Sequence, residues 1–192
     1  KNKISIYGPA TNSEELIKTL IKYLSPPLFP VRIKDFSAEV DFVSMPRKPI
    51  KIGSMSVESE FVCHPGPTLG YRIMDEKFTI AYIPDHEASL GITKPKSEEW
   101  TSGFSIAKNA DVLIHDSQYS TEEYETKVGW GHSSFAQTID FAKRTNAKRL
   151  YFFHHDPGHT DQELQELHFV HTQEPLPFEA QLAKEADTIE LG

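Results

Sequence analysis

Several histidines and aspartates in this sequence directly follow short apolar segments, and one histidine stands at the expected start of a helix. The four residues after apolar segments are His64, Asp85, Asp116 and His154, and the fifth is His132. The ends of neighbouring strands in an α/β sheet lie side by side even when they are far apart in the sequence. We therefore expect these five residues to line a single site.

The residue types at this expected site are suited to a metal. Histidine and carboxylate ligands without thiolate are typical of Zn²⁺, Mn²⁺ or Fe at a hydrolytic centre. Cys63 precedes His64, but alternation along a strand points the two side chains in opposite directions, so Cys63 is expected in the core. His132 precedes the first turn of a helix, where free N–H groups and the helix dipole favour an anion such as phosphate.

The elements that must position these residues have clear local signals. Residues 150–153 are continuously apolar, which is typical of a strand covered on both faces, and the turn 156–158 follows His154. Thr160 with Glu163 predicts a capping box that opens a helix through about His171. A second capping box, Ser134 with Gln137, predicts the helix that follows His132.

The remaining chain predicts a mixed α/β domain. Residues 3–7 alternate as a strand, and Asn12 with Glu15 can cap a helix whose apolar face includes Leu16 and Leu20. A run of short β segments spans 32–63, with a hairpin across 70–83 and a helix over 98–107, while 178–191 is ambiguous. No repeat or linker interrupts residues 1–192, so a single domain is expected.

Composition limits the range of functions. The 192 residues carry a net charge of -8, with 38% hydrophobic and 25% charged residues, which disfavours extensive binding to a nucleic-acid backbone. Cys63 is the only cysteine, so no internal disulfide is expected. No apolar run approaches the length of a membrane span and no signal peptide is visible. We therefore expect a cytoplasmic protein without a membrane partner, and the sequence leaves a homodimer open.

The ordered set of these segments resembles a known family. CHPGPTLGYRI, IAYIPDHE, DVLIHDSQY, GHSSFAQTIDFAK and LYFFHHDPGHTDQEL together resemble the metallo-β-lactamase superfamily, on the side of ribonuclease Z and the small cyclic-phosphodiester hydrolases. The resemblance covers essentially the whole chain. It implies an α/β fold, the four-layer αββα sandwich of that superfamily, of which this chain is expected to form the carboxy-terminal part.

The resemblance also implies roles for individual residues. His64, Asp85 and His154 match metal ligands, in a family pattern that holds two divalent ions, with Zn²⁺ favoured and Mn²⁺ or Fe as alternatives. Asp116 and His132 match the acidic residue and the histidine that assist phosphodiester cleavage. The ribonuclease Z-like branch usually has Glu where this chain has Asp116, and the shorter side chain leaves its acid–base role open.

One family signature, HxHxDH, is missing from these residues. We expect that the amino-terminal sheet and this signature were removed or lie on another chain; a degenerate, metal-free member is the alternative. The predicted function is hydrolysis of phosphodiesters, small cyclic or nucleotide-derived ones, by metal-bound hydroxide, since paired cations activate water near neutral pH. The alternatives are hydrolysis of a thioester, lactone or other carbonyl substrate, and a non-catalytic, partner-binding or regulatory domain.

Other histidines and the two tryptophans have simpler interpretations. His115 follows an apolar strand and is expected to pack against neighbouring residues. Side chains alternate along a strand, so His154 and His155 point in opposite directions and only one of them should be a ligand. His86 and His159 are expected to line a cleft or lie at the surface. His168 and His171 are expected on an exposed helix face. Trp100 and Trp130 are expected in the core and not at the rim of a substrate site.

Overall fold

A computed structural model describes residues 2–9, 13–88, 90 and 97–191 of the chain. These residues form two compact units, 1–47 and 48–192. All five predicted site residues belong to the second unit. That both units form one domain stays a prediction.

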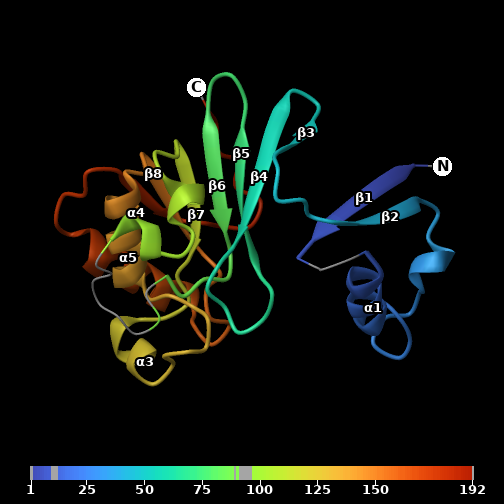
Figure 1. Ribbon diagram of the computed structural model, residues 1–192. Coiled ribbons are helices and arrows are strands. Elements are labelled where there is room, and N and C mark those ends of the chain that lie inside the picture. The colour runs from blue at the N-terminus through green and yellow to red at the C-terminus, as the bar shows by residue number, and fades with distance from the viewer. Residues whose placement is uncertain (1, 10–12, 89, 91–96, 192) are drawn as a thin grey trace. The chain divides into compact units, whose positions relative to one another are not determined.

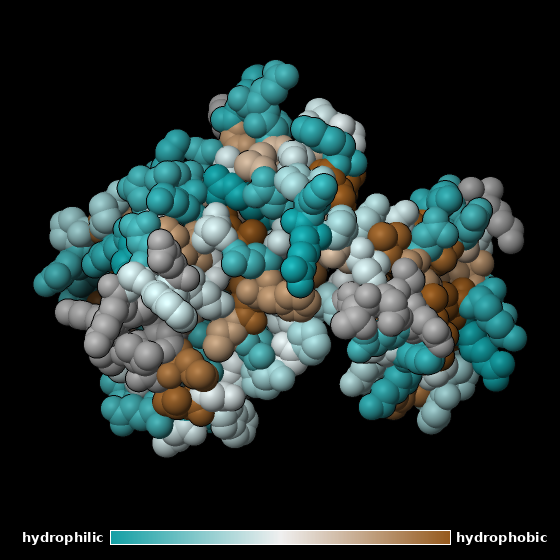
Figure 2. All heavy atoms as spheres, in the orientation of Figure 1, coloured by the Kyte–Doolittle hydropathy of each residue, from teal (hydrophilic) through white to brown (hydrophobic). Residues whose placement is uncertain are grey.

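The first unit is a small α/β element. Strand β1 (Lys3–Gly8) pairs in parallel with β2 (Glu39–Ser44), and helix α1 (Ser13–Tyr23) lies between them in the sequence. Leu16 of α1 is buried against Gly8, where an added Cβ would lie 2.6 Å from Leu16 Cδ1. The predicted cap Asn12 lies outside the described residues. Figure 2 shows apolar residues at the surface of this unit. The large side chains that it exposes include Ile21, Tyr23, Leu28 and Val31.

The second unit is built on a seven-stranded sheet with the order β3-β4-β5-β6-β7-β8-β9 (Figure 1). The strands are β3 (Ile50–Ile52), β4 (Met55–Phe61), β5 (Leu69–Met74), β6 (Thr79–Ile83), β7 (Val112–Asp116), β8 (Arg149–Phe153) and β9 (Glu179–Leu182). Strands β3 to β6 pair antiparallel, and β6 to β9 pair in parallel. The carboxyl ends of β6, β7 and β8 therefore share one edge of the sheet.

Helices pack on the sheet around one core (Figure 1). Helices α2 (Phe104–Ala107), α4 (Phe135–Thr145) and α5 (Asp161–Thr172) contact the strands, and α3 (Thr121–Glu125) lies between β7 and α4 in the sequence. The core includes Leu113, Phe135, Phe141, Leu150 and Phe152. Both predicted capping boxes are present, so the starts of α4 and α5 are confirmed.

Three local predictions were wrong or unresolved. Residues 32–36, expected as β structure, contain the 3-10 helix η1 (Ile33–Asp35). The helix expected over 98–107 is broken into the 3-10 helix η2 (Glu98–Trp100) and α2, because Gly103 takes a φ of 70°, which a continuous right-handed helix excludes. In the ambiguous segment 178–191, residues 179–182 form strand β9, and residues 183–191 contain neither a helix nor a strand. None of the helices in the described ranges has the length and apolarity needed to cross a membrane.

Candidate functional site

The predicted site residues meet at one edge of the seven-stranded sheet. Asp85 follows β6, Asp116 ends β7, and His154 directly follows β8. His64 comes from the turn between β4 and β5, and His132 lies just before α4. The parallel order of β6, β7 and β8 is what brings these distant positions together.

Two overlapping groups of side chains could each hold a metal ion. One is His64, Asp85 and His132, the other is Asp116, His132 and His154, and within each group the donor atoms lie within 4.8 Å of one another. The groups also touch directly, since His154 Nε2 lies 3.4 Å from Asp85 Oδ1. His132, expected to assist phosphodiester cleavage and not to bind metal, is the member that both groups share.

The hydrogen bonds of His64 hold its ring in place from the turn that carries it. Its Nδ1 accepts from the backbone N–H of Gly66 at 3.2 Å and lies 3.0 Å from Thr68 Oγ1. The Thr68 hydroxyl also lies 3.2 Å from Gly66 O. Because an amide N–H can only donate, Nδ1 is an acceptor here and a neutral imidazole carries its proton on Nε2, so a metal at Nε2 would have to displace that proton.

His154 has an unusual backbone for a residue at a strand end. Its φ is 57°, in the left-handed region that non-glycine residues rarely adopt. This conformation ends β8, and its imidazole stacks on that of His132 with ring centroids 4.8 Å apart. Such backbone strain is concentrated at functional sites.

Asp116 is fully buried and saturated with hydrogen bonds. Its Oδ2 accepts from His132 Nδ1 at 2.6 Å and from the backbone N–H of His86 at 2.9 Å. Its Oδ1 accepts from the N–H groups of Gln118 and Ser133. Burial raises the pKa of Asp116, and the hydrogen bond from His132 opposes that rise. A carboxylate with no exposed surface acts on its surroundings through the imidazole that it orients.

The charge state of His132 follows from its carboxylate neighbours. Burial alone would lower the pKa of His132, but the hydrogen bond and charge of Asp116, together with the charges of Asp85 and Glu87, outweigh burial and raise it. The raised pKa favours the imidazolium. In the metal-free protein, His132 is therefore a proton donor beside a cluster of metal-type ligands.

Several N–H groups at the start of α4 are already occupied. The N–H of Ser133 donates to Asp116, that of Ser134 to Gln137 Oε1, and that of Phe135 to Tyr119 O. These three donors are not available to a ligand, and a phosphate at this helix start stays a prediction.

Glu87 is a functional candidate that sequence reasoning missed. It is 1% exposed, and its carboxylate accepts from Tyr124 Oη at 2.6 Å, from Gly129 N at 2.9 Å and from Gly131 N at 2.9 Å. These bonds fix the turn that leads into His132. The available signal was a carboxylate directly after Asp85 and His86, together with the two glycines of VGWGH.

Two histidines beneath the site form a buried pair. His86 Nδ1 lies 2.9 Å from His115 Nε2, and His115 Nδ1 lies 2.7 Å from Asp116 O. Since a carbonyl only accepts, His115 Nδ1 donates, and His115 Nε2 then accepts from His86 Nδ1–H. The packing of His115 is confirmed, while a surface or cleft-lining position for His86 was wrong because it is 0% exposed.

The other histidines lie outside both metal-type groups. His155 stacks over Phe135, and His159 bonds Glu123 at 2.8 Å. The expected exposed face of α5 was wrong, since His168 donates to Ala180 O and His171 stacks on Phe135. Both are half-buried because α5 packs against β9 and α4.

The core position expected for the tryptophans was also wrong. Trp100 is 85% exposed and Trp130 is 58% exposed. Trp100 lies in the short helix η2, and Trp130 lies in the turn before His132. Cys63, also expected in the core, is only half-buried.

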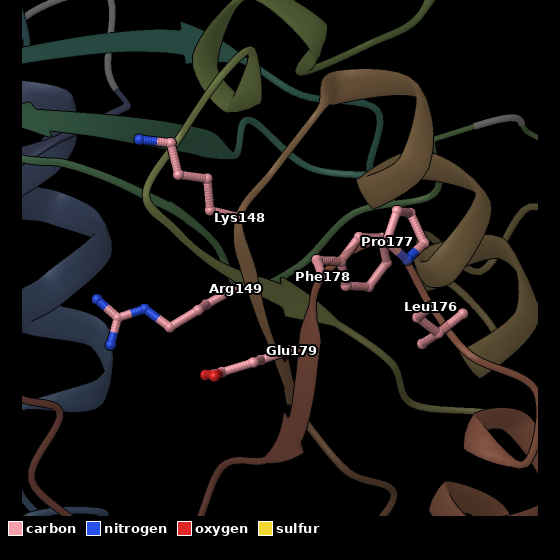
Figure 3. Close-up of a pocket in the computed structure, with 6 residues that line it drawn as sticks. All are labelled: Lys148, Arg149, Leu176, Pro177, Phe178 and Glu179. Atoms are coloured by element: carbon pink, nitrogen blue, oxygen red, sulfur yellow. The ribbon is translucent and has the colours of Figure 1, made fainter.

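A hollow of about 680 Å³ lies at the other end of the parallel strands, near the start of β8. Figure 3 shows its lining residues, with the charged side chains reaching to one side and the apolar ones lying on the other: Lys148, Arg149, Glu179, Leu176, Pro177 and Phe178. Lys148 is already paired with Asp111 at 2.6 Å. Without histidine or a ligand cluster, this hollow is not where the candidate chemistry lies.

Comparison with known proteins identifies the family of this chain. Residues 1–155 match the family described as the Beta-lactamase superfamily domain. Ribonuclease BN of Proteus mirabilis is 36% identical over 80 residues, 38% of this chain and 26% of that protein. Ribonuclease Z of Natronomonas pharaonis is 36% identical over 64 residues, 33% of this chain and 20% of that protein. The chain thus spans about a quarter or less of the length of these relatives.

Solved structures show the same fold. The crystal structure of a diphosphatase from the PhnP family matches 100% of this chain and 60% of its own chain, with a TM-score of 0.64 and 19% identity. The α/β, metallo-β-lactamase-type fold predicted from the sequence is therefore confirmed. The chain belongs to the beta-lactamase superfamily, and its sequence relatives lie in the ribonuclease Z branch.

Proposed function

We propose that this chain carries part of the active site of a metal-dependent hydrolase of phosphodiester bonds. The observation that carries the proposal is the convergence of His64, Asp85 and His154 around the ring of His132, which has a buried carboxylate behind it. His64, Asp85 and His154 would hold the metal, for which Zn²⁺ suits the nitrogen and oxygen donors best, with Mn²⁺ or Fe as alternatives. Two such ions, when bound, supply activated water and charge neutralisation for the phosphoryl group.

The residues of this chain then have separate tasks. Asp116 holds His132 by its Nδ1–H, which leaves Nε2 to contact a substrate oxygen. His132 binds that oxygen and moves a proton to or from it. Asp116 is a positioning residue, because it is buried and reaches the substrate only through His132.

A small substrate fits the chain better than an extended nucleic acid does. The net charge of -8 opposes a long phosphate backbone. Small cyclic or nucleotide-derived phosphodiesters are therefore the proposed substrates, and RNA, suggested by the names of the sequence relatives, is the competing one. A cytoplasmic location and a homodimer stay predictions.

The second candidate is hydrolysis of a carbonyl substrate, such as a thioester or lactone, at the same centre. Attack on a carbonyl does not need a phosphate-handling histidine, so the His132–Asp116 pair favours the phosphodiester. A metal-free binding domain is the third candidate, and the donor geometry of His64 and His154 argues against it.

Turnover of bis-p-nitrophenyl phosphate against p-nitrophenyl acetate, measured on the metal-loaded protein, tests the proposal. His132→Ala should lower phosphodiester turnover about 100-fold, because an acid positioned at the reacting phosphate contributes roughly that factor. Its metal content should be unchanged. His168→Ala, on α5 outside both donor groups, is the matched control and should keep its activity. Faster turnover of the acetate, with His132→Ala unaffected, would favour the carbonyl candidate.

A further inference from the structure

The turn before His132 presents an aromatic ring and a cation at the surface. Trp130 is 58% exposed and its neighbour Val128 is 47% exposed. Lys127 Nζ lies 4.0 Å from the centroid of the Trp130 ring, a cation–π contact that covers part of one ring face. More than half of the tryptophan surface remains accessible.

The backbone beneath this exposed ring is held at several points. Glu87, buried, accepts from the N–H groups of Gly129 and Gly131. Within the turn, Trp130 N donates to Lys127 O at 3.0 Å and Lys127 N to Tyr124 O at 2.9 Å. The exposure of Trp130 is therefore a property of a fixed turn, held from the core by a buried carboxylate.

Gly131 fixes the position of this turn against the site. Its φ is 94°, and an added Cβ would lie 2.3 Å from Pro65 Cδ and 2.5 Å from His64 Cδ2. The backbone next to Trp130 thus contacts a candidate metal ligand directly. Consecutive Cα atoms are about 3.8 Å apart, so the Trp130 Cα lies at most about 7.6 Å from that of His132.

We propose that Trp130, backed by Lys127, stacks the base of a nucleotide phosphodiester whose phosphate lies at His132. The inference rests on the proposed function and names its substrate class. A flat indole beside a phosphate-binding group suits a heteroaromatic base joined to that phosphate through a ribose. Lys127 adds a positive charge that suits the anionic substrate, while the three glutamates of α3 and the net charge oppose an anionic membrane surface.

Two cyclic phosphodiesters that differ in the base test the proposal in the metal-loaded protein. Trp130→Ala should raise KM for adenosine 2′,3′-cyclic phosphate about tenfold, which lies within the range that stacking of one base on an aromatic side chain contributes. Its kcat should stay unchanged, as should KM for glycerol 1,2-cyclic phosphate, which has no base. Trp130→Phe should restore most of the loss. Trp100→Ala, the other exposed tryptophan, is the matched control and should change neither substrate.

A binding measurement separates this inference from the catalytic one. The chain has two tryptophans, so Trp100→Ala leaves Trp130 as the single indole reporter. Adenosine 5′-monophosphate should quench its fluorescence, and ribose 5-phosphate should not. Absence of this quenching, or equal effects of Trp130→Ala on both cyclic substrates, would overturn the stacking role even if turnover persists. Quenching without turnover of either diester would instead support the stacking role and count against the proposed function.

Discussion

Two groups of histidines lie in the same unit and differ in almost every physical property. The inner pair, His86 and His115, is 0% exposed, and burial lowers the pKa of both, that of His115 to about 4. The outer cluster, His64, His132 and His154, is half-buried and faces Asp85 and Asp116. In this cluster the pKa of His132 is raised.

Asp116 joins the two groups. Its backbone carbonyl accepts from His115 of the inner pair, and its carboxylate accepts from His132 of the outer cluster. The His86 backbone N–H also donates to that carboxylate. The buried imidazoles of the inner pair thus fix Asp116, the residue that orients the imidazole of His132. The comparison teaches that neighbours and burial, more than residue type, decide whether a histidine supports structure or can do chemistry.

The largest expected effect tests the outer cluster. His154→Ala should abolish phosphodiester turnover and lose bound metal, because it removes a proposed metal ligand that lies 3.4 Å from Asp85. Elemental analysis and the bis-p-nitrophenyl phosphate assay measure both losses. His132→Ala should keep its metal, so equal metal loss in the two variants would contradict the separate roles of these histidines.

The next effect tests the inner pair. His115→Ala should lower the free energy of unfolding by about 3 kcal/mol or more, because it leaves a cavity beside Phe141 and removes the hydrogen-bond partner of His86. Urea unfolding of the chelated protein measures this loss. His154→Ala, at a partly exposed position, is the comparison and should change the free energy of unfolding far less. A similar loss of unfolding free energy in both variants would contradict a structural role that is specific to the inner pair.

The inner pair and His132 should change the free energy of unfolding in opposite directions as the pH falls. The pKa of His115 is about 4 in the folded protein against 6.5 as its ordinary value, so the unfolded chain binds the proton first. The stability contributed by neutral His115 is complete above pH 6.5 and lost as the pH falls toward 4, with a slope of at most about 1.4 kcal/mol per pH unit for one proton. His86 acts in the same direction.

His132 should act in the opposite direction in the same experiment. Its folded pKa is raised, so its contribution is present below pH 6.5 and lost as the pH rises through the folded value. Urea unfolding of the chelated protein at pH 7.5, 6.5 and 5.5 measures the sum. His132→Ala should therefore steepen the loss of stability on acidification, and a shallower curve would show that the signs are misassigned.

The smallest effect concerns the backbone of the outer cluster. His154→Gly should be more stable than His154→Ala by about 1 kcal/mol, because glycine adopts a φ of 57° without steric cost. Both variants remove the imidazole, so metal binding should not distinguish them, and thermal unfolding measures the difference. Equal stabilities would show that the strand end relaxes to an ordinary conformation once the ring is removed.

The sequence by itself determined where the candidate site residues lie relative to strands and helix starts. Apolar segments followed by His or Asp predicted the strand ends at Asp85, Asp116 and His154, and the capping pairs predicted the starts of α4 and α5. These signals are local: strand periodicity and helix caps depend on residues within a few positions of one another. The same segments carried the resemblance that the family match confirmed.

Only the tertiary structure decided which of these groups are buried and what they contact. The carboxylate of Glu87 accepts hydrogen bonds from Gly129 and Gly131, more than forty positions away. His86, which follows β6, hydrogen-bonds His115 of the neighbouring strand β7. The same long-range packing occupied the N–H groups at the start of α4, exposed Trp130 and gave His132 a place in both donor groups. Burial and hydrogen-bond partners arise from contacts between distant segments, and no local pattern encodes them.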